Sequence, residues 1–324
     1  MLQGASSPRS CLCSGASRLY REAFEMVVKV AGLSYPRHVS EEVDLLARAL
    51  GSASEVYLFV DYGGTLTPGT PNDAGIPNRD VLARLEQLGN EETFNVFVLS
   101  GRTVDELDRL LGVENIGLIG QRGFEIRRRY SEIEHPVDPE TIGSLIHHLE
   151  LNAHSCLEAF NGFSLENRGF ALSLMLGDCT PEAAREISQR FLRAARELDA
   201  GGQLEVLYGD RSIEVRLAGW HKGNAISHIL KGADVEDALA IYMGDDVTDE
   251  DAFEAVKDWA EADLPEEGPW FVSDGDDEDE EPAHALTILV ADRPRPTMAS
   301  LFVRGPQEVY EFLSSLAAIA TALM

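Results

Sequence analysis

The chain has 324 residues, of which 44% are hydrophobic, and this is enough material for one large or two modest domains. Its formal net charge of −29 argues against nucleic acid or an anionic membrane as a partner, because both would repel such a surface. No apolar run approaches the roughly 18 residues that a membrane helix needs, so we expect a soluble, cytoplasmic protein. The four cysteines are too few for a disulfide scaffold and lack the paired spacing of a zinc site.

Lysine is nearly absent, and arginine carries most of the positive charge. An excess of carboxylates with little lysine would suit a salt-rich cytoplasm, in which screening relieves the self-repulsion of the surface. Salt adaptation is one hypothesis for this composition.

Residues 1–50 form an N-terminal extension in our interpretation. Residues 1 to about 25 are rich in Ser, Gly and Arg without periodicity, which predicts disorder. Ser40 has the character of an N-cap, and the two glutamates that follow it favour the first turn of a helix at about residues 40–50.

Residues 56–60, VYLFV, form a continuous apolar run that is typical of a buried strand in a parallel sheet. Asp61 follows directly, and two glycines come shortly after it. Open α/β sheets bind their ligands at the carboxyl ends of their strands, so Asp61 is the candidate reactive group. An Asp that only caps the following turn is the alternative for this residue taken alone.

Residues 96–99 predict a second buried strand, and Ser100, Gly101 and Arg102 come directly after it. A helix is expected to begin at residues 103–104. A hydroxyl group and backbone N–H groups at the start of a helix favour the binding of an anion.

Residues 124–216 predict a small α+β unit. Helices are expected at residues 139–152 and from the Thr-Pro at 180–181 to about residue 198. Residues 162–176 and 204–217 each fit a pair of strands joined by a turn. Residues 124–127 alternate like a further strand.

Lys222 opens a helix with the sequence KGNAISHIL, where its charge can neutralise an anionic site. Residues 238–243 predict another buried strand, and the run GDDVTDED begins at its end. Carboxylate oxygens are the ligands that Mg²⁺ prefers, so this strand end predicts a magnesium site.

The last part of the chain predicts an acidic loop, a strand and a helix. Residues 273–281, SDGDDEDEE, indicate a solvated loop without the ligand spacing of an EF-hand. Residues 288–290 predict an edge strand. A final helix from Pro306 is expected to dock on the core, because its apolar stretch is too short to span a bilayer.

The four strand-end motifs resemble those of the haloacid dehalogenase-like phosphatases, and within them the trehalose-6-phosphate phosphatases. The motifs are DYGGTLTP, LSGR, HKGNAI and GDDVTDEDAF, in this order. The resemblance implies a doubly wound α/β core with a parallel sheet at residues 51–123 and 217–324. It also implies an inserted α+β cap domain at residues 124–216.

The resemblance further implies Mg²⁺-dependent hydrolysis of trehalose 6-phosphate through an aspartyl-phosphate intermediate. Asp61 would attack the phosphoryl group, Ser100 and Lys222 would bind its oxygens, and Asp249 would orient the metal shell. The implied catalytic residues are Asp61, Gly63, Ser100 and Lys222; the metal ligands are Asp61, Gly63, Asp245 and Asp249; the substrate-binding residues are Thr65, Gly101, Arg102, Glu166, Arg168 and Glu214.

Gly63 is the main departure from the family pattern, which has a second aspartate at this position. In the family that carboxylate protonates the leaving alkoxide and later activates water, and the backbone carbonyl of the same residue binds the metal. Gly63 keeps the carbonyl and lacks the carboxylate. A positioned acid or base supplies roughly a hundred- to ten-thousand-fold in rate, so we expect weak or absent turnover.

The expected sugar site also departs from the family. Glu166 with Arg168 resembles the family's ExK run, with arginine in place of lysine, and Glu214 resembles its later glutamate. Gln121 and Arg122 stand where the family has a residue and a histidine before glycine, which leaves the identity of the sugar open. Taken alone, these charged residues fit equally well on the solvated faces of hairpins.

Three functions therefore remain open: a trehalose-phosphatase with impaired chemistry, a phosphosugar-binding or regulatory protein without turnover, and a phosphatase for another sugar phosphate, such as sucrose phosphate or a glycosyl phosphoglycerate. A trehalose-6-phosphate synthase is a candidate partner for the first two.

Overall fold

The computed structural model describes residues 33–68, 75–199, 201–209, 211–262 and 283–323. The first part of the expected N-terminal extension, with Cys11 and Cys13, and the acidic run at 273–281 lie outside the described residues. The expected helix near residues 40–50 is α2 (Val43–Ser52), preceded by the 3-10 turn η1 (Val39–Glu41). No helix in the described part of the chain is long and apolar enough to cross a membrane.

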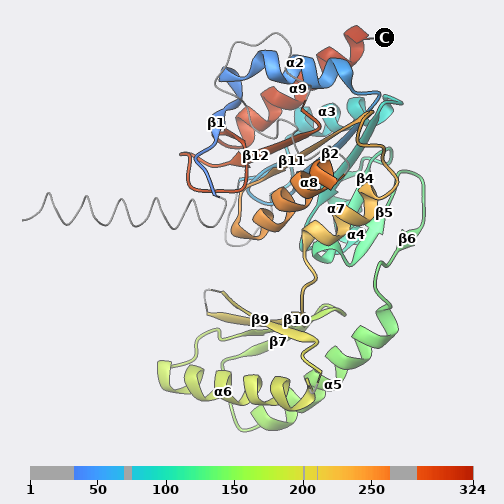
Figure 1. Ribbon diagram of the computed structural model, residues 1–324. Helices are drawn as coiled ribbons and strands as arrows, with labels where there is room; N and C mark the ends of the chain where they lie inside the picture. Colours follow the sequence, from blue (N-terminus) through green and yellow to red (C-terminus); the bar gives the residue numbers. More distant parts are fainter. Residues whose placement is uncertain (1–32, 69–74, 200, 210, 263–282, 324) are drawn as a thin grey trace, which may run out of the picture.

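The described residues form one large sheet and one small sheet (Figure 1). In the described part of the chain the large sheet has nine strands. In its spatial order the first seven strands pair parallel with their neighbours, and the last two, β5 and β6, are added antiparallel. In spatial order its strands are β1 (Arg37–His38), β13 (Leu301–Val303), β12 (Ala285–Val290), β11 (Ala238–Gly244), β2 (Glu55–Asp61), β3 (Phe94–Leu99), β4 (Gly117–Gly120), β5 (Glu125–Arg127) and β6 (Ile133–Glu134).

Strand β2 shows why this sheet is covered on both faces. Its residues alternate sides, so Leu58 and Val60 belong to one apolar cluster while Phe59 belongs to the other. One face is covered by α2, α3 (Arg79–Asn90), α4 (Val104–Leu111) and α9 (Pro306–Leu323), and the other by α7 (Lys222–Leu230) and α8 (Glu250–Ala262). The expected doubly wound α/β core is confirmed.

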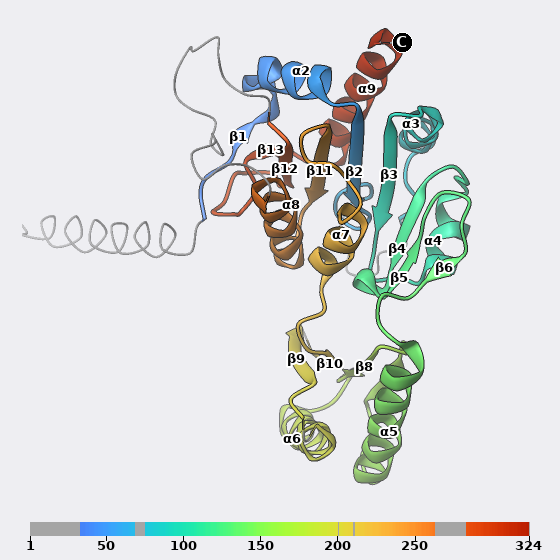
Figure 2. The same cartoon turned by 45° about the vertical axis from the view of Figure 1, so that its right-hand side comes forward.

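The small sheet is antiparallel, and among the described residues helices pack on one of its faces only. Its strand order is β7 (Ser164–Asn167), β8 (Ala171–Met175), β10 (Ser212–Leu217) and β9 (Leu204–Gly209). Apolar residues of α5 (Pro139–Leu157) and α6 (Pro181–Leu198) pack against it. Figures 1 and 2 show these helices on the side away from the large sheet, so the other face of the small sheet is turned towards the core.

The strand expected at residues 124–127 in the cap belongs instead to the large sheet. Its residues 125–127 form β5, which pairs antiparallel with β4, and Ile126 lies opposite Ile119 in the same apolar cluster. A tight turn is enough to join two antiparallel strands, so no crossover is needed here. We propose that the cap comprises residues 139–217 and the core comprises the described residues on either side.

The strand expected at an edge, residues 288–290, is likewise interior. Strand β12 lies between β11 and β13, and β1 pairs beyond β13. Strands of three and two residues, such as β13 and β1, are too short to give a periodic signal in the sequence.

The final helix packs on the core as expected, and Leu313 is fully buried in it. We expect Leu313→Ala to lower the free energy of unfolding by about 2–5 kcal/mol, because it removes buried methyl groups and leaves a cavity. The exposed Ser315→Ala on the same helix is the control and should change it by less than about 0.5 kcal/mol. Urea denaturation measures both, and equal effects would contradict the docking of α9.

Candidate active site

The strand ends that carry the expected reactive residues are neighbours in the sheet. Strand β2 lies between β11 and β3, and all three run parallel. Asp61 is the last residue of β2, Ser100 follows β3, and Asp245 follows β11. The parallel arrangement therefore gathers these three residues at one edge of the sheet.

Lys222 completes this group from the first turn of α7. Its Nζ lies 2.6 Å from Asp61 Oδ1 and 2.6 Å from Asp249 Oδ1. All three side chains are buried. A buried ammonium group between two carboxylates is held by charge-assisted hydrogen bonds in a region of low dielectric constant.

Asp249 holds several of these groups in place. Its Oδ1 accepts hydrogen bonds from Lys222 Nζ and from Tyr242 Oη at 2.6 Å. Its Oδ2 accepts from the backbone N–H groups of Asp245 at 3.0 Å and Asp246 at 2.9 Å. Because both oxygens are already occupied, this geometry favours Asp249 as the residue that orients Lys222 and the turn after β11.

The charges of the site shift the pKa values of its members. Burial raises the pKa of Asp61 well above its usual range, although Lys222 opposes this shift. Burial and then the charge of Asp249 raise the pKa of Asp245 to about 6. Burial alone would lower the pKa of Lys222, but Asp61 and Asp249 outweigh it and the pKa is raised. Lys222 therefore remains charged at neutral pH.

The group has the donor set of a hard divalent cation. One carboxylate oxygen from each of Asp61, Asp245 and Asp249 lies within 4.8 Å of the others. Asp245 Oδ1 is buried and has no hydrogen-bond partner among the residues that the structure describes, so it is available as a ligand. Three carboxylates against the single ammonium of Lys222 leave an excess of negative charge, which a divalent cation would neutralise.

The two glycines after Asp61 have different backbone conformations. Gly64 has a φ of +84°, and a Cβ atom there would lie 2.0 Å from Asp245 Oδ2. Among the described residues, Gly63 does not belong to those with positive φ, and it forms an isolated bridge with Thr67. An L-residue therefore meets no such backbone strain at Gly63. Thr65 is fully buried, and within the described part of the chain its hydroxyl has no hydrogen-bond partner.

Some of the backbone N–H groups that we expected to bind an anion at the start of α4 are engaged by the chain itself. The N–H of Thr103 donates to Glu106 Oε2, and the N–H of Val104 donates to Glu125 Oε2 at 2.7 Å. The N–H of Arg102 donates to Ser100 Oγ at 3.2 Å. Carboxylates of the chain itself thus occupy two N–H groups of this turn, while the hydroxyl proton of Ser100 stays available for an anion.

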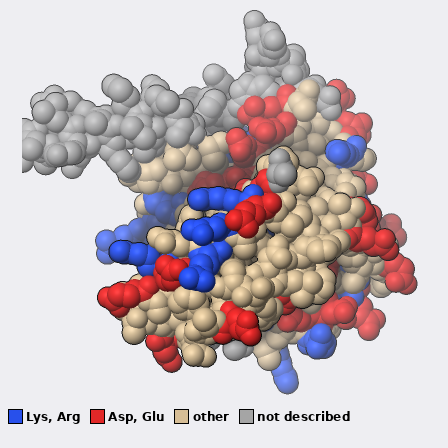
Figure 3. Space-filling model, turned by 90° about the horizontal axis from the view of Figure 1, so that it is seen from below, with Lys and Arg blue, Asp and Glu red and all other residues tan. Residues whose placement is uncertain are grey.

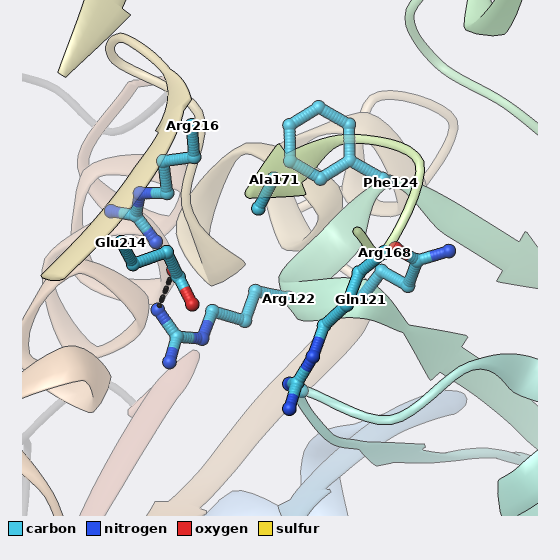
Figure 4. A pocket seen from close by; sticks show the side chains of 8 residues that line it. Gln121, Arg122, Phe124, Arg168, Ala171, Glu214 and Arg216 are labelled. Atoms are coloured by element: carbon cyan, nitrogen blue, oxygen red, sulfur yellow. Dashed lines mark hydrogen bonds and ion pairs between the residues drawn. The ribbon is translucent and has the colours of Figure 1, made fainter. Parts of the chain in front are cut away.

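The expected sugar-binding residues lie on the face of the small sheet that carries no helices. Cross-strand pairing places Glu166, Ser173 and Glu214 in one row. A pocket is lined by Gly101, Gln121, Arg122, Phe124, Arg168, Ala171, Glu214 and Arg216 (Figure 4). Gly101, Arg168 and Glu214 thus come together, whereas Glu166 does not line this pocket and pairs with Arg168 at 3.0 Å.

Two residues of the site escaped the sequence analysis. Tyr242 lies within the apolar run of β11, and its hydroxyl was the only local sign that it could bind Asp249. Arg122 was noted only as a departure from the family, yet its Nη1 lies 2.8 Å from Glu214 Oε1. Arg122 and Glu214 are 92 positions apart, and Tyr242 and Asp249 face each other across the turn after β11; local periodicity reveals neither contact.

The charge of the molecular surface is uneven (Figure 3). On the face seen from below, acidic side chains are dispersed, while most of the basic ones gather in one group. Helix α6 contributes four exposed arginines to the cap: Arg185, Arg190, Arg193 and Arg196. The basic side chains on this face are therefore clustered within an acidic molecule.

We expect the affinity for Mg²⁺ to fall about tenfold between pH 7 and pH 5, because protons compete for Asp245, whose pKa is about 6. Since this folded pKa lies above the usual carboxyl value, Asp245 makes the metal-free protein less stable as pH rises from about 4 to 6. Titration calorimetry at pH 5, 6 and 7 measures the affinity. A matched Asp245→Asn variant should bind more weakly and with less dependence on pH, and an affinity of the parent that is independent of pH would contradict this assignment.

We expect Gly64→Ala to weaken Mg²⁺ binding at least tenfold, because the new methyl group collides with Asp245 and the left-handed backbone is strained. Gly51→Ala is the control, since a Cβ atom there meets nothing within 4 Å and α2 accommodates alanine. The measurement is calorimetric titration with Mg²⁺. Unchanged binding in Gly64→Ala would show that Asp245 is not held against this turn.

Comparison with known proteins points to the same family as the strand-end motifs. The sequence model of the trehalose-phosphatase family matches residues 59–281, which is more than half of the chain. The probable trehalose-phosphate phosphatase 3 of Oryza sativa subsp. japonica is 27% identical over 292 residues, covering 84% of this chain and 72% of that protein. A bifunctional trehalose-6-phosphate synthase/phosphatase of Thermoproteus tenax is 28% identical over 226 residues, covering 68% of this chain and 30% of that protein.

Among solved structures, the trehalose-6-phosphate phosphatase of Aspergillus fumigatus, in crystal form 2, matches with a TM-score of 0.62 and 25% identity. The match covers 88% of this chain and 100% of that chain. Fold, motifs and relatives thus agree, and this chain belongs to the trehalose-phosphatase family of haloacid dehalogenase-like phosphoric monoester hydrolases.

Proposed function

We propose that this protein is a Mg²⁺-dependent phosphatase for trehalose 6-phosphate whose turnover is limited by the absence of a carboxylate at residue 63. The buried residues Asp61, Lys222 and Asp249, together with the half-buried Asp245, are the observation that carries this proposal. They combine a nucleophile, the held ammonium group of Lys222 and free carboxylate oxygens at the carboxyl ends of neighbouring strands.

Asp61 is the proposed nucleophile. Lys222 holds its Oδ1, which leaves Oδ2 for attack on phosphorus. Displacement of the sugar alkoxide would give an aspartyl phosphate, and water would then hydrolyse it to regenerate the carboxylate. Mg²⁺, when bound by Asp61, Asp245 and the carbonyl of Gly63, would neutralise charge on the phosphoryl oxygens.

Ser100 and Lys222 are the proposed phosphate-binding groups. The Oγ of Ser100 accepts one hydrogen bond from its own turn, so its proton is available for a phosphate oxygen. Lys222 supplies a charge whose position is set by Asp61 and Asp249. Asp249 acts in this scheme mainly through Lys222 and the backbone after β11.

Gly63 leaves two proton transfers without a group to perform them. The leaving alkoxide needs a proton, and the attacking water must lose one. A second candidate function therefore rests on this same residue: a protein that binds the sugar phosphate and Mg²⁺ without releasing phosphate, as a regulatory protein would. The relative that joins a synthase and a phosphatase in its name supports a trehalose-6-phosphate synthase as partner in either case.

Phosphate release from trehalose 6-phosphate in the presence of Mg²⁺ tests the proposal. We expect slow release by the parent and an increase of about a hundred- to ten-thousand-fold in Gly63→Asp, because the carboxylate restores both proton transfers. Gly63→Asn is the matched control, since it has the same shape but cannot transfer the proton, and it should remain slow. Sucrose phosphate and a glycosyl phosphoglycerate, assayed in parallel, test the sugar.

The outcomes separate the candidates. Rapid release by the parent would show that another group replaces the acid and would contradict the limitation at Gly63. If neither the parent nor Gly63→Asp releases phosphate, while both still bind Mg²⁺ and trehalose 6-phosphate, the function as a sugar-phosphate-binding protein is favoured. Faster hydrolysis of another sugar phosphate would replace the proposed substrate.

A further inference from the structure

The chain adopts a strained backbone where it leaves the end of β4. Gln121, Arg122 and Gly123 have φ values of +48°, +57° and +110°. Residues other than glycine rarely adopt positive φ, and two in succession persist only where the surroundings enforce them. The contacts of these residues are therefore the ones that hold the backbone in this conformation.

The backbone of this turn is fastened to the turn that carries Ser100. The N–H of Gln121 donates to the carbonyl of Arg102 at 2.6 Å, and the N–H of Arg122 donates to the carbonyl of Ser100 at 2.9 Å. The Gln121 side chain donates to Glu125, which in turn accepts from the first turn of α4. The two turns thus form one rigid unit at the expected phosphate site.

The side chain of Arg122 reaches from this unit to the cap. It passes beside Gly101, where a Cβ atom would lie 3.6 Å from Arg122 Nε. Its Nη1 then donates to Glu214 Oε1 on β10 at 2.8 Å (Figure 4). The two side chains are 31% and 17% exposed, so the pair is partly shielded from solvent.

The other contacts of Glu214 hold it in the cap. Its Oε2 accepts from Ser173 Oγ on β8 at 3.3 Å. The neighbouring Arg216 is engaged by Glu205 at 2.6 Å and lines the same pocket. Glu214 is therefore shared: one oxygen contacts the cap sheet and the other contacts the core through Arg122.

We propose that Arg122 is a positioning residue that couples the sugar-binding face of the cap to the phosphate-binding turn of the core. The coupling sets the affinity for phosphorylated disaccharides, which touch both sides, and not for inorganic phosphate, which touches only the core. The choice of ligand rests on the proposed function, whereas the contact itself does not. Because the pair is partly exposed, salt weakens the coupling.

Titration calorimetry with Mg²⁺ and two probes, trehalose 6-phosphate and inorganic phosphate, tests the coupling. We expect Arg122→Asn to lower the affinity for trehalose 6-phosphate about tenfold or more, because it loses a hydrogen bond between charged groups. The affinity for inorganic phosphate should change less than about twofold. Asparagine tolerates positive φ, so the backbone is preserved, and Arg122→Lys should recover part of the affinity.

Two further variants sharpen the test. Arg127→Gln breaks an ion pair of 2.6 Å with Asp108, in which both residues belong to the core domain, and it should alter neither affinity. The double variant Arg122→Asn with Glu214→Gln should lose little more affinity than Glu214→Gln alone, because both changes break one contact. Additive losses, or equal losses for the two probes, would overturn the coupling.

Hydrogen exchange of the ligand-free protein tests the contact without any substrate. We expect faster exchange in the two segments that link core and cap, residues 135–138 and 218–221, in both Arg122→Asn and Glu214→Gln, but not in Arg127→Gln. Unchanged exchange in these segments would overturn the contact. If the parent binds no trehalose 6-phosphate but the variants change hydrogen exchange as expected, the proposed function is contradicted and the coupling of core and cap is supported.

Discussion

The burial of Lys222 between Asp61 and Asp249 is the interaction on which the site depends. A buried charge is costly unless it is paired, and here one ammonium group meets two carboxylates at 2.6 Å each. The pairing links the start of α7 to the end of β2 and to the 3-10 turn η3 (Val247–Asp249) that follows β11, so it fixes three separate elements. Asp245 adds a further carboxylate, and the resulting excess of negative charge gives the site its capacity for a divalent cation.

Gly63 changes what this arrangement can accomplish without changing how it is built. The carboxylates, the lysine and the serine needed to hold a phosphate and a cation are present around it. Proton transfer is a separate requirement that none of these groups meets in the proposed mechanism, since Asp61 is committed to attack and Lys222 stays charged. If the proposed mechanism holds, binding and turnover are separable in this protein, and ligand affinity can be measured apart from chemistry.

The cap and the core meet through side chains of opposite charge at the pocket. Arg122 and Glu214 come from different sheets, and the strained turn that carries Arg122 is itself fastened to the Ser100 turn. A ligand that spans the pocket contacts residues of both sheets, which the Arg122–Glu214 pair holds together, whereas a small anion contacts only residues of the core. The position of a residue that touches no reacting atom thus bears on which substrates are retained.

Apolar periodicity and glycine, proline and capping residues act locally, so they predicted the α/β core, its strand-end motifs and the two helices and two hairpins of the cap. It also singled out Asp61, Ser100, Lys222, Asp245 and the gap at Gly63. Contacts of the folded chain place β5 in the large sheet, bring carboxylates to the start of α4, and bring Tyr242 to Asp249 and Arg122 to Glu214. Arg122 and Glu214 are 92 positions apart, β5 is a strand of 3 residues, and Tyr242 meets Asp249 across a turn; none of these leaves a periodic pattern in the sequence.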